Sequence, residues 1–181
     1  MNPLIQITGL PRSGTAFVST LLNLNPDCIA FHELASTDLK WRDTIAEARL
    51  DYEFVADVTT YGFLPKVVDR DATKVFIDIP WRESLNSAAE AFGVEPDGEA
   101  YESLHSLAKD WMIEHDPLVI NSSELWTVDS LKAIWLHCFG FDGMHFPEAK
   151  VKLLIGMNIQ RNNPKELFGH DCFVGRHEEF V

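Results

Sequence analysis

Short apolar runs alternate with longer amphipathic stretches along the chain, a pattern typical of α/β proteins. Residues 4–10 are an apolar run rich in β-branched residues, which predicts a buried strand. The next stretch places Phe17, Leu21 and Leu24 at helical spacing, and Pro26 ends it. The chain therefore opens with a strand, a tight loop and a helix.

The same alternation continues along the chain. Further strands are expected at residues 28–31, 54–58, 74–79 and 118–121. Further helices are expected over 38–50 with Ser36 or Thr37 as the cap, over 84–92, from the cap Asp97 to Pro117, from the cap Thr127 to Cys138, and over 148–159. Residues 160–181 are expected to be a loop-like tail. We therefore expect one domain over 1–181, with a central parallel sheet between two layers of helices, a three-layer α/β/α fold.

Charge and composition narrow the classes of function. Asp and Glu number 28 and Lys and Arg number 15, which gives a net charge of −13. Broad nucleic-acid binding relies on clustered cations and is not expected. The three cysteines have no paired spacing, so neither a disulfide framework nor a zinc site is expected, and a cytoplasmic setting fits. No apolar run reaches the roughly 20 residues that cross a bilayer, so no membrane partner is expected.

The chemistry concentrates in the loop Gly9-Leu10-Pro11-Arg12-Ser13-Gly14-Thr15, between the first strand and the first helix. A glycine-bracketed loop at this place turns backbone N–H groups inward, and the helix adds the positive end of its dipole. The spacing is similar to the phosphate loop G-x-x-x-x-G-K-[ST], but Gly14 runs directly into Thr15 without the lysine. The missing lysine argues against an ordinary ATPase or GTPase.

These residues resemble the sulfotransferase family, in the form Gly-x-Pro-Arg-Ser-Gly-Thr of tyrosylprotein and many bacterial sulfotransferases. The resemblance implies a P-loop NTPase-like fold and the donor 3′-phosphoadenosine 5′-phosphosulfate, with adenosine 3′,5′-bisphosphate as product and no metal. It places the donor's 5′-phosphate on the backbone of a loop formed by Pro11, Arg12, Ser13, Gly14, Thr15 and Ala16, with the N–H groups of Ser13 to Thr15 as donors. Ala16 replaces the family's second threonine. Arg12 stands at the catalytic cation, and Phe17 stands at the aromatic residue that stacks on adenine or, alternatively, belongs to the core.

A second patch of resemblance covers residues 74–88, where the family holds the donor's 3′-phosphate with an arginine and a serine. Ser87 matches the serine. Ile79 occupies the arginine position, and the nearest cation is Arg82. The 3′-phosphate is therefore assigned to Arg82 and Ser87, or it is not recognised. The likeness is specific over the first 35 residues and looser up to about residue 90.

An acceptor loses a proton as it attacks, so a base is expected at the carboxyl end of a neighbouring strand. His32 and Glu33 follow the second strand. We favour Glu33 and keep His32 as its rival, because adjacent strand residues point to opposite faces and only one of them enters the site. Asp57, on the next strand, is the third candidate.

The sequence thus predicts a sulfotransferase-like enzyme that moves a sulfuryl group to a hydroxyl or amine of a small-molecule or peptide acceptor. Two alternatives stay open. A P-loop kinase or hydrolase would need Mg²⁺ and an acidic ligand such as Asp78 or Asp57. A nucleotide-binding protein without turnover would keep the loop but transfer nothing.

Overall fold

The computed structural model of the chain describes residues 3–37, 39–93, 97–140 and 145–157. Within them, five strands form one parallel sheet in the order β2-β3-β1-β4-β5. The strands are β1 (Ile5–Gly9), β2 (Cys28–His32), β3 (Phe54–Thr60), β4 (Thr73–Asp78) and β5 (Leu118–Asn121). Because all strands run in the same direction, their carboxyl ends meet at one edge of the sheet.

Strand β1 lies at the centre of the sheet, between β3 and β4. Its last residue, Gly9, lies opposite Thr60 of β3 and Ile77 of β4. All five residues of β1 are buried, as expected for a strand covered on both faces. The chain first winds from β1 toward β2 and later continues on the other side through β4, and ligands of open α/β sheets bind where the winding reverses. The carboxyl end of β1 is this place.

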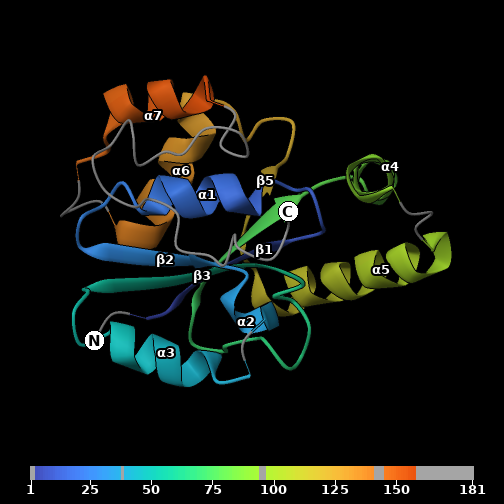
Figure 1. Ribbon diagram of the computed structural model, residues 1–181, viewed down its shortest axis with the longest axis horizontal. Coiled ribbons are helices and arrows are strands. Elements are labelled where there is room, and N and C mark those ends of the chain that lie inside the picture. Colours follow the sequence, from blue (N-terminus) through green and yellow to red (C-terminus); the bar gives the residue numbers. More distant parts are fainter. Residues whose placement is uncertain (1–2, 38, 94–96, 141–144, 158–181) are drawn as a thin grey trace.

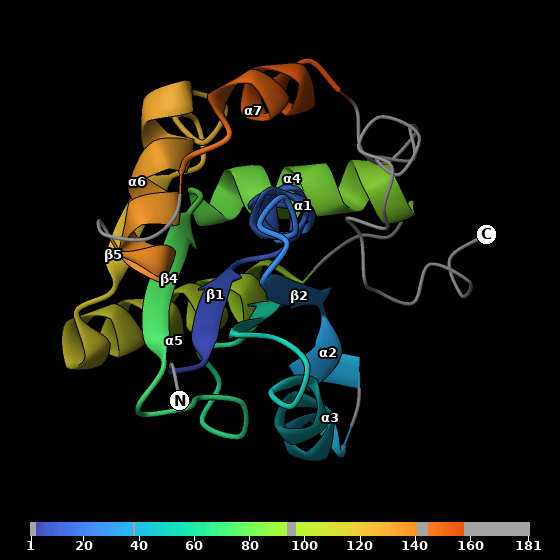
Figure 2. The ribbon, with the colours of Figure 1, turned by 90° about the vertical axis from the view of Figure 1, so that its left-hand side faces the viewer.

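Helices cover both faces of the sheet, as the sequence predicted, and Figures 1 and 2 show the resulting three layers. One face carries α1, α6 and α7, the other carries α3 and α5, and α4 lies past the arrowhead of β4 (Figure 1). The helices are α1 (Thr15–Leu22), α2 (Leu34–Thr37), α3 (Trp41–Ala48), α4 (Trp81–Phe92), α5 (Gly98–His115), α6 (Val128–Phe139) and α7 (Glu148–Ile155).

Successive residues of the central strands point to opposite faces of the sheet, where they pack in separate hydrophobic clusters. Ile7 of β1 packs with Phe17 of α1 and Trp135 of α6 on one face. On the other face, Phe76 packs with Trp111 of α5, and Trp41 of α3 packs in a third cluster. The helices are therefore fixed to the sheet by side chains that the strand periodicity directs to them.

The predicted elements are recovered with local differences. Asp97 and Thr127 cap α5 and α6 as predicted, accepting from the N–H groups of Glu99 and Ser130. The helix predicted over 38–50 is wrong in its start: α2 comes first, and α3 begins only at Trp41, which is buried with Ile45 against the sheet.

The ends of three other elements also differ. Strand β3 extends to Thr60 because it pairs with β1 over that length, and α4 begins at Trp81, directly after Pro80. The helix predicted over 148–159 ends at Ile155, and the expected tail over 160–181 lies outside the described residues. Among the described helices, none is both long and apolar enough to cross a bilayer.

The edge strand β2 is covered by a side chain. The amide of Asn23, at the end of α1, donates to the carbonyl oxygen of Ala30 at 2.9 Å and accepts from its N–H at 2.9 Å. The hydroxyl of Ser19 donates to the same carbonyl oxygen at 3.4 Å. The backbone of Ala30 thus completes its hydrogen bonds within the chain, as buried polar groups require.

Candidate functional site

Three residues at the carboxyl edge of the sheet hold a backbone conformation that side chains rarely adopt. Arg12, Glu33 and Tyr61 follow β1, β2 and β3, with φ of 67°, 60° and 65°. Left-handed backbone at residues other than glycine is costly and concentrates at functional sites. Three of the four such residues in the described parts of the chain therefore lie at the edge that the winding of the sheet indicates, and the fourth, Asp116, ends α5.

The loop after β1 exposes three consecutive backbone donors. Among the described residues, the N–H groups of Gly14, Thr15 and Ala16 have no hydrogen-bond acceptor, and they open the first turn of α1. Unpaired N–H groups at a helix N-terminus form an anion site, strengthened by the helix dipole. Of the predicted donors, Ser13 to Thr15, the N–H of Ser13 donates to the carbonyl oxygen of Leu10 at 3.2 Å, and those of Gly14 and Thr15 are open.

Both glycines of the loop are required by space. A Cβ on Gly9 would lie 2.6 Å from the carbonyl oxygen of Ile77, and one on Gly14 would lie 2.5 Å from Cδ2 of Leu125. Gly14 also has φ of 102°, which a side chain would strain. The side chain of Leu125, in the segment after β5, therefore supports the cradle from the α6 side of the molecule.

Helix α4 brings two serines to the loop. Ser87, predicted as a phosphate ligand, accepts from Nε of the exposed Arg12 at 3.2 Å. Ser84, which sequence reasoning missed, is fully buried and donates to the carbonyl oxygen of Pro11 at 2.6 Å. Its only signal is the i, i+3 spacing to Ser87, which places both on one helix face. Helix α4 thus holds the loop and the guanidinium of Arg12 together.

Two residues predicted as ligands make aromatic contacts in the structure. Phe17 is 1% exposed and belongs to the hydrophobic core, so its face is closed to a base. The guanidinium of Arg82 lies over the ring of Trp81 at 4.4 Å from the centroid. Ile79, which the resemblance aligns with an arginine, is buried in the cluster of Phe76 and Trp111.

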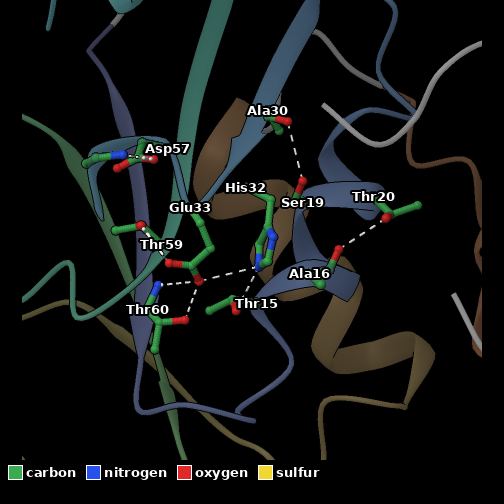
Figure 3. Close-up of polar contacts among 11 residues, drawn as sticks. Thr15, Ala16, Ser19, Thr20, Ala30, His32, Glu33, Asp57, Thr59 and Thr60 are labelled. Carbon is green, nitrogen blue, oxygen red and sulfur yellow. Dashed lines mark hydrogen bonds and ion pairs between the residues drawn. The ribbon is translucent and has the colours of Figure 1, made fainter. Parts of the chain in front are cut away.

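The three carboxyl-edge candidates for the base are separated by the structure (Figure 3). Nε2 of His32 lies 3.3 Å from Oγ1 of Thr15 and 3.5 Å from Oε1 of Glu33. The expectation that His32 and Glu33 face opposite sides is therefore wrong. Glu33 lies past the end of β2, and its left-handed backbone breaks the strand alternation.

The carboxylate of Glu33 is held by the end of β3. Oε1 accepts from the N–H of Thr60 at 2.9 Å and from its hydroxyl, and Oε2 accepts from the hydroxyl of Thr59 at 3.2 Å (Figure 3). The Glu33 side chain remains 24% exposed, so a molecule at this edge can reach it. Thr59 and Thr60 were missed because their role follows only from the pairing of β2 with β3.

Asp57 does not reach this surface. It is 0% exposed and shares a strand face with Val55, which packs against Trp41 of α3. Its Oδ1 accepts from the N–H of Ala35 at 3.3 Å, and Oδ2 has no partner among the described residues. Burial, with a smaller contribution from the nearby Glu33, raises the pKa of the Asp57 carboxyl to about 7, although the backbone hydrogen bonds from Ala35 and Leu34 lower it.

No family model matches the chain, and no curated protein is detectably similar to it. Assignment of a function therefore relies on the geometry of this edge. In the described parts of the chain, no group of three or more His, Cys, Asp and Glu side chains is arranged to hold a metal ion. The arrangement instead offers backbone donors, one guanidinium and a carboxylate.

Replacing Asp57 with Asn is expected to change how stability depends on pH. Because the folded-state pKa lies above the unfolded value of 3.8, the folded protein binds the proton more tightly, and Asp57 lowers stability progressively as pH rises from about 4 to about 7. Asp57→Asn removes this loss and keeps an acceptor for Ala35. Its melting temperature relative to the parent should therefore increase between pH 5 and pH 8. A difference that stays constant with pH would contradict the raised pKa.

Proposed function

We propose that this chain is a sulfotransferase-like enzyme with a P-loop NTPase-like fold, which moves a sulfuryl group from 3′-phosphoadenosine 5′-phosphosulfate to a hydroxyl or amine. The observation that carries the proposal is the pairing of the three open N–H groups of Gly14 to Ala16 with the guanidinium of Arg12. This pairing supplies an anion cradle with a directed cation and without the lysine of nucleotide hydrolases. The loop sequence matches the sulfotransferase form at the same residues.

The chemistry follows from these groups. As the acceptor oxygen or nitrogen bonds to sulfur, the bond from sulfur to the donor's bridging oxygen breaks, and negative charge develops on the departing phosphate. Arg12 and the cradle N–H groups stabilise that charge, which is the main requirement of such a transfer. The acceptor's proton passes to Glu33, whose carboxylate the end of β3 holds in place.

The nucleobase needs a flat partner, and Trp126 fits this role better than Phe17. Trp126 is 47% exposed, and its ring packs on Phe17 with centroids 4.5 Å apart. The residue before it, Leu125, lies against Gly14 of the cradle. Aromatic side chains beside a phosphate site bind bases by stacking. We assign the adenine to Trp126, with Phe17 as the buried support behind it.

The acceptor side lies between Glu33 and the aromatic residues that follow β3. The N–H of Tyr61 donates to the carbonyl oxygen of Gly9 at 3.3 Å, which places Tyr61 beside the cradle. Burial raises the pKa of Tyr61 to about 12, with further contributions from Tyr101 and Glu33, so its hydroxyl stays protonated and donates to Tyr101. This side of the site thus has a carboxylate next to a neutral aromatic wall.

Adenosine 3′,5′-bisphosphate should raise the melting temperature without added metal, because the cradle and Arg12 already supply the positive field. Differential scanning fluorimetry measures this shift, and comparison with adenosine 5′-monophosphate gives the part of the shift that is due to the 3′-phosphate. Arg12→Ala should lose most of the shift for both ligands. Arg82→Ala is the matched control on α4. If Arg82 holds the 3′-phosphate, this variant should reduce the shift with the bisphosphate to that with the monophosphate and leave the monophosphate shift unchanged.

A larger shift with ATP that depends on Mg²⁺ would contradict this assignment and favour a kinase or hydrolase. Stabilisation by the bisphosphate without measurable transfer from the phosphosulfate donor would identify a binding protein instead. Both outcomes are read from the same preparation of the protein.

Trp126→Leu should weaken binding of adenosine 3′,5′-bisphosphate by roughly 5- to 100-fold, because stacking of a base on an aromatic ring contributes about 1–3 kcal/mol. Binding of pyrophosphate, which has no base, should not change. Isothermal titration calorimetry measures both, and Trp126→Phe serves as the control that keeps an aromatic face. Equal losses for both ligands would mean that the substitution damages the cradle and that Trp126 is not the platform.

Glu33→Gln should lower kcat by roughly 10²- to 10⁴-fold with donor affinity little changed, because the amide keeps the shape but does not take a proton. His32→Gln should have a smaller effect, since Thr59 and Thr60 still hold the carboxylate of Glu33. Steady-state transfer assays with donor titration measure both. The opposite ranking would make His32 the base.

A further inference from the structure

Asp57 is the most deeply buried acidic group near the site, and its hydrogen bonds all go to one short segment. Oδ1 accepts from the backbone of Ala35 at 3.3 Å, and the backbone of Leu34 also bonds to this carboxyl. Both residues belong to α2, which begins directly after Glu33. The carboxyl of Asp57 therefore fixes the start of α2 to the middle of β3.

Glu33 lies between this anchor and a second one. On its amino side, the N–H of Glu33 donates to the carbonyl oxygen of Val58 at 3.0 Å. On its carboxyl side, Leu34 and Ala35 are bound to Asp57. Between the two, Glu33 holds φ of 60°, a conformation that persists only when the surroundings impose it. Both anchors, Val58 and Asp57, are residues of β3, and Figure 3 shows Asp57 and Thr60, which binds the Glu33 carboxylate, on opposite sides of Glu33.

The arrangement of the anchors determines where the carboxylate of Glu33 lies. With a right-handed or extended backbone, the residue after His32 would leave the strand in another direction, and its side chain would leave Thr59 and Thr60. The hydrogen bonds from Thr60 to the Glu33 carboxylate form only when the backbone of Glu33 is already left-handed. They therefore do not by themselves prevent another backbone conformation. Oδ1 of Asp57, which binds the backbone of Ala35 in α2, restricts the backbone conformation of Glu33.

We propose that Asp57 is a positioning residue for Glu33, which it keeps in the left-handed conformation by binding the first turn of α2. The proposal rests on the proposed function in one respect, that Glu33 accepts the proton of the acceptor. Asp57 itself touches neither substrate nor donor, since it is 0% exposed. Asp57 supplies an acceptor oxygen for the first turn of α2. Its other oxygen, Oδ2, is buried without a partner among the described residues, which is unfavourable for stability.

The first experiment compares Asp57→Ala with Asp57→Asn in transfer assays. Asp57→Ala removes the acceptor oxygen and should lower kcat by roughly 10- to 100-fold, because small displacements of a reacting group are costly, with little change in the KM for the donor. Asp57→Asn keeps Oδ1 and should restore kcat toward that of the parent protein. If the asparagine variant loses as much as the alanine variant, the charge or proton of Asp57 matters, and the positioning role is overturned.

A double-mutant cycle tests whether Asp57 acts through Glu33. When Glu33→Gln has already removed the proton acceptor, adding Asp57→Ala should produce almost no further loss of kcat. A loss in that background as large as in the parent would show that Asp57 acts elsewhere, and would overturn the proposal. A general loss of stability does not produce this pattern, because it would lower both backgrounds alike.

Amide signals in NMR spectra keep the test independent of transfer. Asp57→Ala should speed hydrogen exchange at Ala35 and shift the carboxyl ¹³C signal of Glu33, whereas Asp57→Asn should do neither. If the parent protein transfers nothing, the proposed function fails, and these signals still decide the structural part. Unchanged signals in Asp57→Ala would overturn it. Should that variant not fold, Asp57→Ser, whose hydroxyl is one atom shorter, replaces it in all three measurements.

Discussion

The turn from β1 into α1 is tightly packed, with no space for a side chain at Gly9 or Gly14. A Cβ on Gly9 would meet the backbone of β4, and a Cβ on Gly14 would meet Leu125. Between these contacts the chain passes through the left-handed conformations of Arg12 and Gly14, and the N–H groups of Gly14 to Ala16 have no acceptor among the described residues. Ser84 and the guanidinium of Arg12 join this turn to α4, and Trp126 packs on Phe17 of the helix that follows the turn.

Much of this could be predicted from the sequence because it depends on local patterns. The strand periodicity, the caps Asp97 and Thr127 and the spacing of Gly9 and Gly14 are properties of neighbouring residues, and the structure has them where they were expected. The three-layer arrangement follows from the alternation of strands and helices. The same holds for the nearness of His32 and Glu33 to the cradle, since carboxyl ends of parallel strands meet at one edge.

The details that failed depend on contacts between distant segments. The faces of His32 and Glu33 were wrongly separated because strand alternation stops where Glu33 becomes left-handed, and that conformation depends on Val58 and Asp57 of another strand. The turn that the N–H of Ser13 closes on Leu10 was likewise not evident from the sequence. Ser84 gave no signal, since a serine at a helix start has many possible roles until the loop it supports is known.

The side chain of Asn23 has a consequence for how copies of this protein meet. An edge strand with unpaired backbone groups is a template on which another chain adds a strand, and parallel sheets can extend into fibres in this way. At Ala30 that template is already occupied by an amide that belongs to the same chain and bonds twice. To pair with Ala30, an incoming strand would have to displace this amide. At Ala30, one asparagine of the same chain therefore occupies the backbone groups that a neighbouring strand would need.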